Sequence, residues 1–322
     1  DKAYEESEKF KEFADKNPKV FKIAKKLEGL NKNTGVHPSG IAISFYNIEE
    51  IMPMQRTSDG DLISAYDMND VASLMVKFDI LGLRTLSVVH ETCKQLGINM
   101  EDIDVELPEI YENFKNIEAP KGLFQIEADT NFKVCKKISP RNLEELSAVV
   151  AIARPGALDY LDVYGDYIST GEFQSVNECF DDILSYTGGI PLYQEQLMKM
   201  AVKVGFTLDE SEQLRRIVGK KKVDQMATWK IKIEDKIKEN GLDSQVGDVL
   251  WKVAEDSANY SFNKSHSISY AILAAITTYL KFKYPQEFFL SLLKMTKHEP
   301  DSHAEIALIN QELCLFNMKL LP

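Results

Sequence analysis

The sequence predicts a mainly α-helical protein that carries a small α/β piece near its start. From residue 84 onward, apolar side chains recur at helical spacing almost throughout, whereas short runs that alternate or stay apolar are confined to residues 35–85. Hydrophobic residues make up 44% and charged residues 27% of the 322 positions, which is an ordinary balance for a globular chain. This length predicts two or more domains.

The expected elements follow in chain order. Residues 4–28 predict two helices divided at Pro18, because proline cannot donate the hydrogen bond that a helix interior needs. Strands are expected at 40–45, 62–66 and 74–80, with Asp59-Gly60 as a hairpin-type turn between the first two. Helices are expected at 84–97, 108–116, 128–137, 141–152, 175–186, 191–204, 208–218, 223–239, 244–258, 265–283, 286–295 and 301–316.

Composition excludes several classes of protein. The four cysteines are widely scattered without a CxxC pair, which predicts reduced thiols and no zinc site. The longest apolar stretch, 268–280, falls short of the ~20 residues that a bilayer requires, so we expect no membrane contact and a cytoplasmic location. The start at Asp1 and the extended end at Pro322 are expected of an excised fragment, and a sheet this small is expected to need further strands from upstream.

Charge is strongly segregated along the chain. The net charge of −12 argues against uniform binding of nucleic acid. Residues 213–238 nevertheless hold nine Lys or Arg against three Asp or Glu, and residues 99–118 hold seven acids against one lysine. This separation of basic and acidic segments is more informative about binding than the net charge of the whole chain.

Two segments of the α/β piece carry candidate chemistry. Lys77 and Asp79 lie on one face of an expected strand, because side chains repeat every second residue. A carboxylate there suits a hard divalent cation, and the alternative is a buried ion pair at a strand end. The turn that holds His37, Ser39 and Gly40 would let a ligand approach the backbone closely, and the alternative is an ordinary turn.

Two helical segments carry cations. Arg215 and Arg216 precede a glycine that Lys220, Lys221 and Lys222 follow, and such groups suit phosphate oxygens. The alternative for these five side chains is a solvated basic face. The second segment holds Tyr260, Lys264 and His266 at the start of an apolar helix, where they could hold a triphosphate and stack on a base. The alternative is a polar helix cap.

Together these segments resemble the C-family replicative DNA polymerases, the family of the alpha subunit of bacterial DNA polymerase III. No single segment is specific, but seven occur in the family's order over most of the chain. They are Gly-Val-His-Pro-Ser-Gly (35–40), Val-Lys-Phe-Asp-Ile-Leu-Gly-Leu-Arg-Thr-Leu (76–86), Phe-Gln-Ile-Glu (124–127), Arg-Pro-Gly (154–156), Tyr-Gln-Glu-Gln (193–196), Leu-Arg-Arg-Ile-Val-Gly-Lys-Lys-Lys (214–222) and Phe-Asn-Lys-Ser-His-Ser (262–267).

The resemblance implies a layout and partners. Residues 1–33 resemble the end of a thumb, residues 34–85 the second half of a palm of the beta-type nucleotidyltransferase kind, and residues 86–322 an all-helical fingers region. The family uses primer–template DNA, deoxynucleoside triphosphates and two Mg²⁺ ions. It also contacts replisome proteins such as the sliding clamp, which would involve parts of the protein outside this chain.

The resemblance also implies roles for single residues. Asp79 matches the third metal-binding palm aspartate and Lys77 a lysine near the catalytic centre. The fingers positions associated with the incoming nucleotide are matched by Arg215, Arg216, Tyr260, Lys264 and His266, to which Gln125 is added. The contacts to DNA or phosphate are assigned to Lys220, Lys221, Lys222, His37, Ser39 and Gly40.

The sequence departs from the family pattern at several positions. Ser39 replaces one glycine of a pair, Ala153 stands where an aromatic is usual, and Asn259 and Ser261 stand where glycines are usual. These changes are expected of a divergent member, a phage-encoded one included. Two other functions stay open: a non-catalytic helical module that binds DNA or a partner protein, and a nucleotidyltransferase that uses ribonucleotides.

Overall fold

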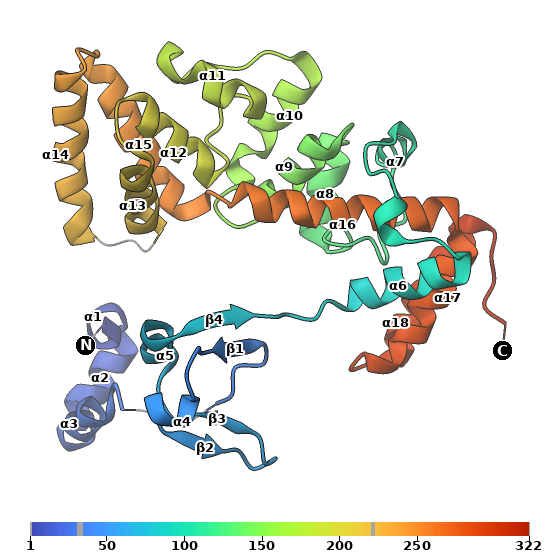
Figure 1. Ribbon diagram of the computed structural model, residues 1–322, viewed down its shortest axis with the longest axis horizontal. Helices are drawn as coiled ribbons and strands as arrows, with labels where there is room; N and C mark the ends of the chain where they lie inside the picture. The colour runs from blue at the N-terminus through green and yellow to red at the C-terminus, as the bar shows by residue number, and fades with distance from the viewer. Residues whose placement is uncertain (1, 31–34, 220–222, 322) are drawn as a thin grey trace. The chain divides into compact units, whose positions relative to one another are not determined.

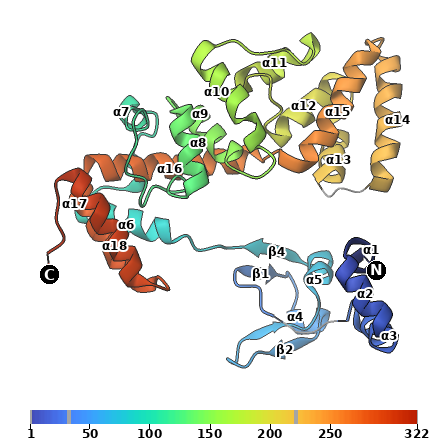
Figure 2. The same ribbon diagram turned by 180° about the vertical axis from the view of Figure 1, so that it is seen from behind.

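The computed structural model describes residues 2–30, 35–219 and 223–321, and the chain in it divides into two compact units between Gly82 and Leu83. Figures 1 and 2 show a first unit of short helices and strands and a second unit built from helices. The predicted mainly α class is thereby confirmed.

The first unit begins with three short helices. They are α1 (Lys2–Glu6), α2 (Glu8–Lys16) and α3 (Pro18–Leu27). Pro18 occupies the first turn of α3, where its missing N–H has no intrahelical partner to lose. The expected division at Pro18 is therefore confirmed, but the expected number of two helices is wrong, because the chain divides again at Ser7, whose side chain caps α2.

Two separate antiparallel strand pairs follow. Strands β1 (Gly40–Ile43) and β4 (Val76–Asp79) form one pair, and β2 (Met54–Arg56) and β3 (Leu62–Ser64) form the other. Helices α4 (Ile48–Ile51) and α5 (Met68–Leu74) lie between the strands in the sequence.

The hairpin prediction is wrong about one of the two strands that the turn joins. Asp59-Gly60 does form the turn, with Gly60 at φ +92°, but it joins β2 to β3 and leaves β1 to pair with the distant β4. The strand Met54–Arg56 escaped prediction because a run of three residues, two of them polar, shows no recognisable alternation.

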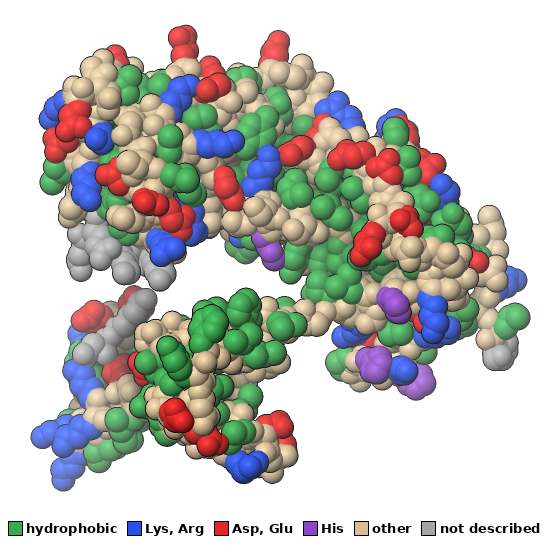
Figure 3. All heavy atoms as spheres, in the orientation of Figure 1, with side chains coloured by type: hydrophobic (Ala, Val, Ile, Leu, Met, Phe, Trp, Pro, Cys, Tyr) green, Lys and Arg blue, Asp and Glu red, His purple; other side chains and the backbone are tan. Residues whose placement is uncertain are grey.

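The β1–β4 pair exposes an apolar face. Ile41 lies opposite Phe78 and Ile43 opposite Val76, and all four side chains are about half exposed. Figure 3 shows hydrophobic side chains gathered over these strands. Lys77 and Asp79 project from the other face, since side chains alternate along a strand.

The second unit is built from helices, apart from loops and one isolated β-bridge between Tyr193 and Phe262 among its described residues. Its elements are α6 (Arg84–Leu96), η1 (Met100–Asp102), α7 (Pro108–Glu112), α8 (Asp129–Ile138), α9 (Leu143–Ile152), η2 (Leu158–Tyr160), α10 (Leu161–Thr170), η3 (Glu178–Phe180), α11 (Asp181–Leu184), η4 (Ser185–Thr187), α12 (Gln194–Lys203), α13 (Leu208–Gly219), α14 (Val223–Glu239), α15 (Ser244–Tyr260), α16 (Lys264–Lys283), α17 (Pro285–Met295), η5 (Thr296–His298), α18 (Ser302–Leu313) and η6 (Cys314–Phe316).

Helix prediction failed in one region. The single helix expected at 175–186 is broken into η3, α11 and η4, and α10 at 161–170 was not expected at all. Elsewhere in the second unit the expected helices agree with the structure to within a few residues, whereas α4 and α5 of the first unit were not expected. No helix among the described residues is long and apolar enough to cross a membrane.

Helix α16 is the axis of the second unit. It packs against α6, α7, α9 and α17, and both ribbon views show it running from the α12–α15 group to α17. One apolar core joins α8, α9 and α16, and a second joins α12, α13, α14 and α15. The start of α16 therefore lies where these two cores adjoin.

The other end of α16 carries a buried ion pair. Lys281 is fully buried, and its ammonium donates to Glu312 Oε1 (2.8 Å) and to the carbonyls of Ala119 (2.7 Å) and Lys121 (2.6 Å). Burial lowers the pKa of Lys281 to about 8 and raises the pKa of Glu312. The pair joins α16 and α18 to the 119–121 segment.

Replacing Lys281 by Met is expected to destabilise the chain by about 3–5 kcal/mol, because Glu312 would be left buried without a countercharge. The double variant Lys281→Met, Glu312→Gln removes both charges and keeps an oxygen that can accept the Lys121 N–H. Urea unfolding should find the double variant more stable than Lys281→Met alone. A double variant that is less stable than the single one would show that the unpaired charge is not the cause.

Candidate functional site

The first unit brings His37, Gly40, Lys77 and Asp79 together at one end of the β1–β4 pair. Gly40 pairs with Asp79 across the strands, and Lys77 Nζ lies 2.7 Å from Asp79 Oδ1. His37 Nε2 lies 3.9 Å from the same oxygen, while His37 Nδ1 accepts a hydrogen bond from the Ser39 N–H (3.2 Å). A Cβ on Gly40 would come within 2.9 Å of His37 and 3.0 Å of Lys77, so glycine permits this close packing.

Asp79 is exposed, which corrects the expectation of a buried acid. Its side chain is 58% accessible, because β4 ends there and β1 is the one strand that pairs with β4 in the described part of the chain. The hydrogen bond from Lys77 holds the pKa of Asp79 below its usual range, so the carboxylate is ionised at neutral pH. The Lys77–Asp79 ion pair, which is the alternative to metal binding, is present, although Asp79 is exposed rather than buried.

Metal ligands are sparse at this position. An ionised, accessible carboxylate is a suitable oxygen ligand for Mg²⁺, which commonly takes one or two carboxylates together with phosphates and water. No group of three His, Cys, Asp or Glu that could hold a metal occurs among the residues that the structure describes. Asp79 therefore fits a Mg²⁺ site as one ligand and does not complete one.

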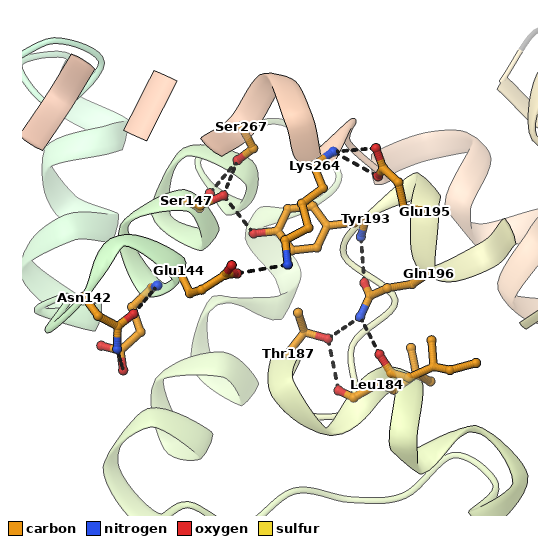
Figure 4. Close-up of polar contacts among 12 residues, drawn as sticks. Asn142, Glu144, Ser147, Leu184, Thr187, Tyr193, Glu195, Gln196, Lys264 and Ser267 are labelled. Atoms are coloured by element: carbon orange, nitrogen blue, oxygen red, sulfur yellow. Dashed lines mark hydrogen bonds and ion pairs between the residues drawn. The ribbon is translucent and has the colours of Figure 1, made fainter. Parts of the chain in front are cut away.

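A backbone junction positions the cationic residues of the second unit. Phe262 N–H donates to the Leu192 carbonyl (3.1 Å), and Gln194 N–H donates to the Phe262 carbonyl (2.9 Å). The junction places the start of α12 beside the start of α16. Glu195 then caps α16, because its carboxylate accepts the Lys264 N–H (2.9 Å) and the Asn263 side-chain amide (2.9 Å). Figure 4 shows Glu195 facing the Lys264 backbone.

The same junction holds Arg215. Its Nη1 donates to Gln194 Oε1 (3.0 Å), and its Nε and Nη2 donate to the Glu212 carboxylate (2.7 and 2.6 Å). Arg216 Nε donates to Glu212 as well (2.8 Å), because residues three and four positions on share one helix face with Glu212. The Arg215 side chain and the Lys264 backbone N–H thus reach the consecutive residues Gln194 and Glu195.

The Lys264 side chain lies over aromatic rings. Its Nζ is 3.1 Å from Glu144 Oε2, 4.6 Å from the ring centre of Tyr186 and 5.5 Å from that of Tyr193. Those three side chains line a cavity of about 420 Å³ between α9, α10 and the 186–193 segment. The Tyr193 hydroxyl is fixed by Ser147 (3.1 Å), as Figure 4 shows.

His266 lies in the first turn of α16, and Phe124, the neighbour of Gln125, contacts the same helix farther along. His266 packs against Tyr270 (ring centres 4.1 Å apart), and Tyr270 packs against Phe124 (5.0 Å). The Phe124 N–H donates to Thr277 on α16 (3.1 Å). Gln125 has a left-handed backbone with φ +60°, which is uncommon for a residue with a Cβ.

Tyr260 is placed differently from expectation. It is only 6% exposed, and its ring packs on Tyr160 with ring centres 4.8 Å apart. A base could stack on this ring only by displacing Tyr160. The Tyr260 carbonyl accepts from Arg154 Nη2 (2.7 Å), while the Arg154 guanidinium lies 3.8 Å from the ring centre of Phe262.

Several predicted residues lie outside this geometry, and several important ones were missed. Lys220, Lys221 and Lys222 lie outside the described residues. Of the carboxylates that organise the cations, Glu144 and Glu212 were not singled out, and Glu195 lay within a family motif (193–196) without being assigned a role. Arg154, which binds the Tyr260 carbonyl, likewise lay within the motif 154–156 without a role. A carboxylate that caps a distant helix has no local sequence signature. The i, i+3 and i, i+4 spacing of Glu212 to the two arginines is the one signal that could have found a member of this set.

Comparisons with known proteins agree along the whole chain. A family model described as "Bacterial DNA polymerase III alpha NTPase domain" matches residues 1–82, and one described as "Bacterial DNA polymerase III alpha subunit finger domain" matches residues 84–241. The DNA polymerase III subunit alpha of Thermus aquaticus is 34% identical over 89% of this chain and 24% of its own length.

Two further relatives cover nearly all of the chain. The corresponding subunit of Campylobacter jejuni is 34% identical over 100% of this chain and 28% of its own length, and that of Aquifex aeolicus is 32% identical over 98% and 28%. The chain therefore spans about a quarter of the length of these curated relatives.

The Glu212 carboxylate gives a pH-dependent contribution to stability. Hydrogen bonds from Arg215 and then Arg216 lower its pKa to about 2, from an ordinary 4.5. Because the folded-state pKa is depressed, this contribution is complete above about pH 4.5 and is lost as the pH falls toward 2. The difference in unfolding free energy between the wild type and Glu212→Gln, measured by denaturant titration, should shrink from pH 6 to pH 3. A difference that stays constant over this range would contradict the assignment.

Proposed function

The chain belongs to the family of bacterial DNA polymerase III alpha subunits, and on this premise we propose that it is the part of a template-directed DNA polymerase that binds the incoming dNTP and the primer–template. The observation that carries the proposal is the junction at Gln194 and Glu195, which binds the Arg215 guanidinium and the Lys264 backbone N–H. This junction joins α13, which carries Arg215 and Arg216, to the first turn of α16, which carries Lys264 and His266, and arginine and lysine are suited to phosphate oxygens.

The proposed reaction is nucleotidyl transfer. A primer 3′-hydroxyl attacks the α-phosphorus of a dNTP, and pyrophosphate leaves. Arg215 and Arg216 would bind phosphate oxygens through their planar donor forks, and Lys264 and His266 would neutralise charge that builds on the leaving pyrophosphate. Gln125 and Tyr260 remain proposed nucleotide contacts, the latter only if Tyr160 moves aside.

Asp79 is the proposed ligand for Mg²⁺ in the first unit. When bound, the two metal ions that this family uses would stabilise charge on the attacking and leaving oxygens. Lys77 would then share its hydrogen bond between Asp79 and a neighbouring phosphate, and the His37–Gly40 turn would let a phosphate approach the backbone. The accessible carboxylate and the small residue beside it support this assignment.

The layout of the complete polymerase is also proposed by family membership. Residues 1–33 would be the end of the thumb, residues 34–85 the second half of the palm and residues 86–322 the fingers. The sliding clamp and other replisome partners, and the cytoplasmic location, remain predictions. A chain that binds DNA or protein but no nucleotide would instead be the non-catalytic module.

Replacing Arg215 and Arg216 together by Ala is expected to abolish binding of a dNTP, because both phosphate forks are lost. The measurement is titration of dATP followed by calorimetry. As a matched control, Lys137→Ala with Lys203→Ala removes two cations that pair with Asp162 and Asp182 elsewhere on the same unit. Unchanged affinity in the arginine variant, or equal loss in the control, would remove these arginines from the site.

The 322-residue chain alone is expected to show no polymerase activity, because one carboxylate cannot organise two Mg²⁺ ions. The measurement is primer extension with Mg²⁺, all four dNTPs and a complete DNA polymerase as the positive control. Template-dependent synthesis by the isolated chain would overturn the expectation. If a chelator then stopped that synthesis, the chain would have to contain further metal ligands besides Asp79.

A further inference from the structure

We propose that Glu144 is a positioning residue for Lys264. With Tyr186 and Tyr193 it holds the Lys264 ammonium in a resting position, which the ammonium must leave before it can take a phosphate oxygen. The inference rests on the proposed function, because it concerns the same triphosphate site and says what sets its affinity.

The contacts of the Lys264 side chain define the resting position. The ammonium pairs with Glu144 and lies over the rings of Tyr186 and Tyr193, so one charge is held by a carboxylate and by two aromatic faces. Figure 4 shows the Lys264 side chain passing beside the Tyr193 ring toward Glu144. In the described part of the chain, Lys264 is the only ion-pair partner of Glu144.

The ammonium can move while its backbone stays fixed. The Lys264 N–H is held by Glu195, and Asn263 caps the same helix turn by accepting the His266 N–H (2.8 Å). Tyr193 is fixed at its hydroxyl by Ser147, and its backbone N–H donates to Gln196 Oε1 (2.8 Å). A flexible four-carbon stem therefore joins a rigid helix start to a mobile charge.

Charge balance shows why release matters. The three cations Arg215, Arg216 and Lys264 stand against the three carboxylates Glu212, Glu144 and Glu195. These six side chains together carry no net positive charge with which to attract a triphosphate. Of the three carboxylates, Glu195 caps a helix and Glu212 orients two arginines. Glu144 forms an ion pair with the Lys264 side chain and with no other residue in the described part of the chain. Glu144 is thus the carboxylate whose removal frees a cation without dismantling the site.

The test is titration of inorganic tripolyphosphate, without metal, into the 322-residue chain. Glu144→Gln should bind about two- to five-fold more tightly than the wild type, the size expected when one partly exposed ion pair no longer competes. The matched control Glu109→Gln breaks the Lys283–Glu109 pair, whose carboxylate has a similar exposure (55% against 58%), and should leave the affinity unchanged.

A second variant guards against loss of structure. Glu144 lies in the first turn of α9, where a carboxylate stabilises the helix, so its removal can weaken the fold. Tyr186→Leu removes one of the two rings that hold the Lys264 ammonium. Tyr186 is partly exposed and the substitution changes no charge, so this variant should also bind tripolyphosphate more tightly. The Lys264 ε-CH₂ signal, assigned by its loss in Lys264→Arg, should be shielded by the tyrosine rings and lose that shielding as tripolyphosphate binds.

The outcomes separate this inference from the proposed function. If Glu144→Gln and Tyr186→Leu bind tripolyphosphate no more tightly than the wild type, while the Arg215→Ala, Arg216→Ala variant loses binding, the resting position is wrong and the nucleotide site stands. If the wild type and Glu144→Gln both fail to bind tripolyphosphate, both proposals are overturned.

Discussion

The arrangement of the helical unit depends on the need to cover α16 on every side. Residues 273–278 are all buried, and six consecutive residues extend over more than one helical turn, so the helix is enclosed at that point. Ala274 and Ala275 keep the surface small enough for α9 to approach. Thr277 and Thr278 satisfy their hydroxyls by donating to the Ala274 carbonyl, which removes the usual penalty for burying polar groups.

This enclosure ties the candidate site to the interior of the unit. The first turn of α16 carries Lys264 and His266, and its last turn carries Lys281, which is fixed by Glu312 and two carbonyls. Lys264 and His266 are therefore mounted on an element that cannot shift without disturbing the core. The Lys264 side chain remains adjustable, held by Glu144 and two tyrosine rings, whereas His266 packs against Tyr270.

Both units share the feature that their candidate cations are already paired. Lys77 is bound to Asp79 in the first unit, and Arg215 and Lys264 are bound to Glu212 and Glu144 in the second. Such pairs fix the side chains before a ligand arrives, yet they reduce the field that an anionic ligand meets. Binding of a phosphate chain is then an exchange of partners, and the carboxylates influence affinity as directly as the cations do.

The sequence by itself determined the features that depend on near neighbours. The division at Pro18 and the apolar periodicity of α16 are each determined within a few residues, as is each of the ordered motifs that identified the family. The candidate residues Arg215, Lys264, Lys77 and Asp79 were also found this way. The structure pairs Lys77 with Asp79, and it brings the Arg215 side chain and the Lys264 backbone to the consecutive residues Gln194 and Glu195.

Only the tertiary structure decided which distant segments meet. Three contacts join parts of the chain that are far apart in sequence: β1 with β4, Tyr260 with Tyr160, and Lys264 with Glu144. The exposure of Asp79 likewise depends on which strands lie beside β4. Local hydrogen bonding and side-chain periodicity act over three or four residues and carry no information on these contacts. They are set by how whole helices and strands cover one another's apolar faces, which is a property of the folded chain.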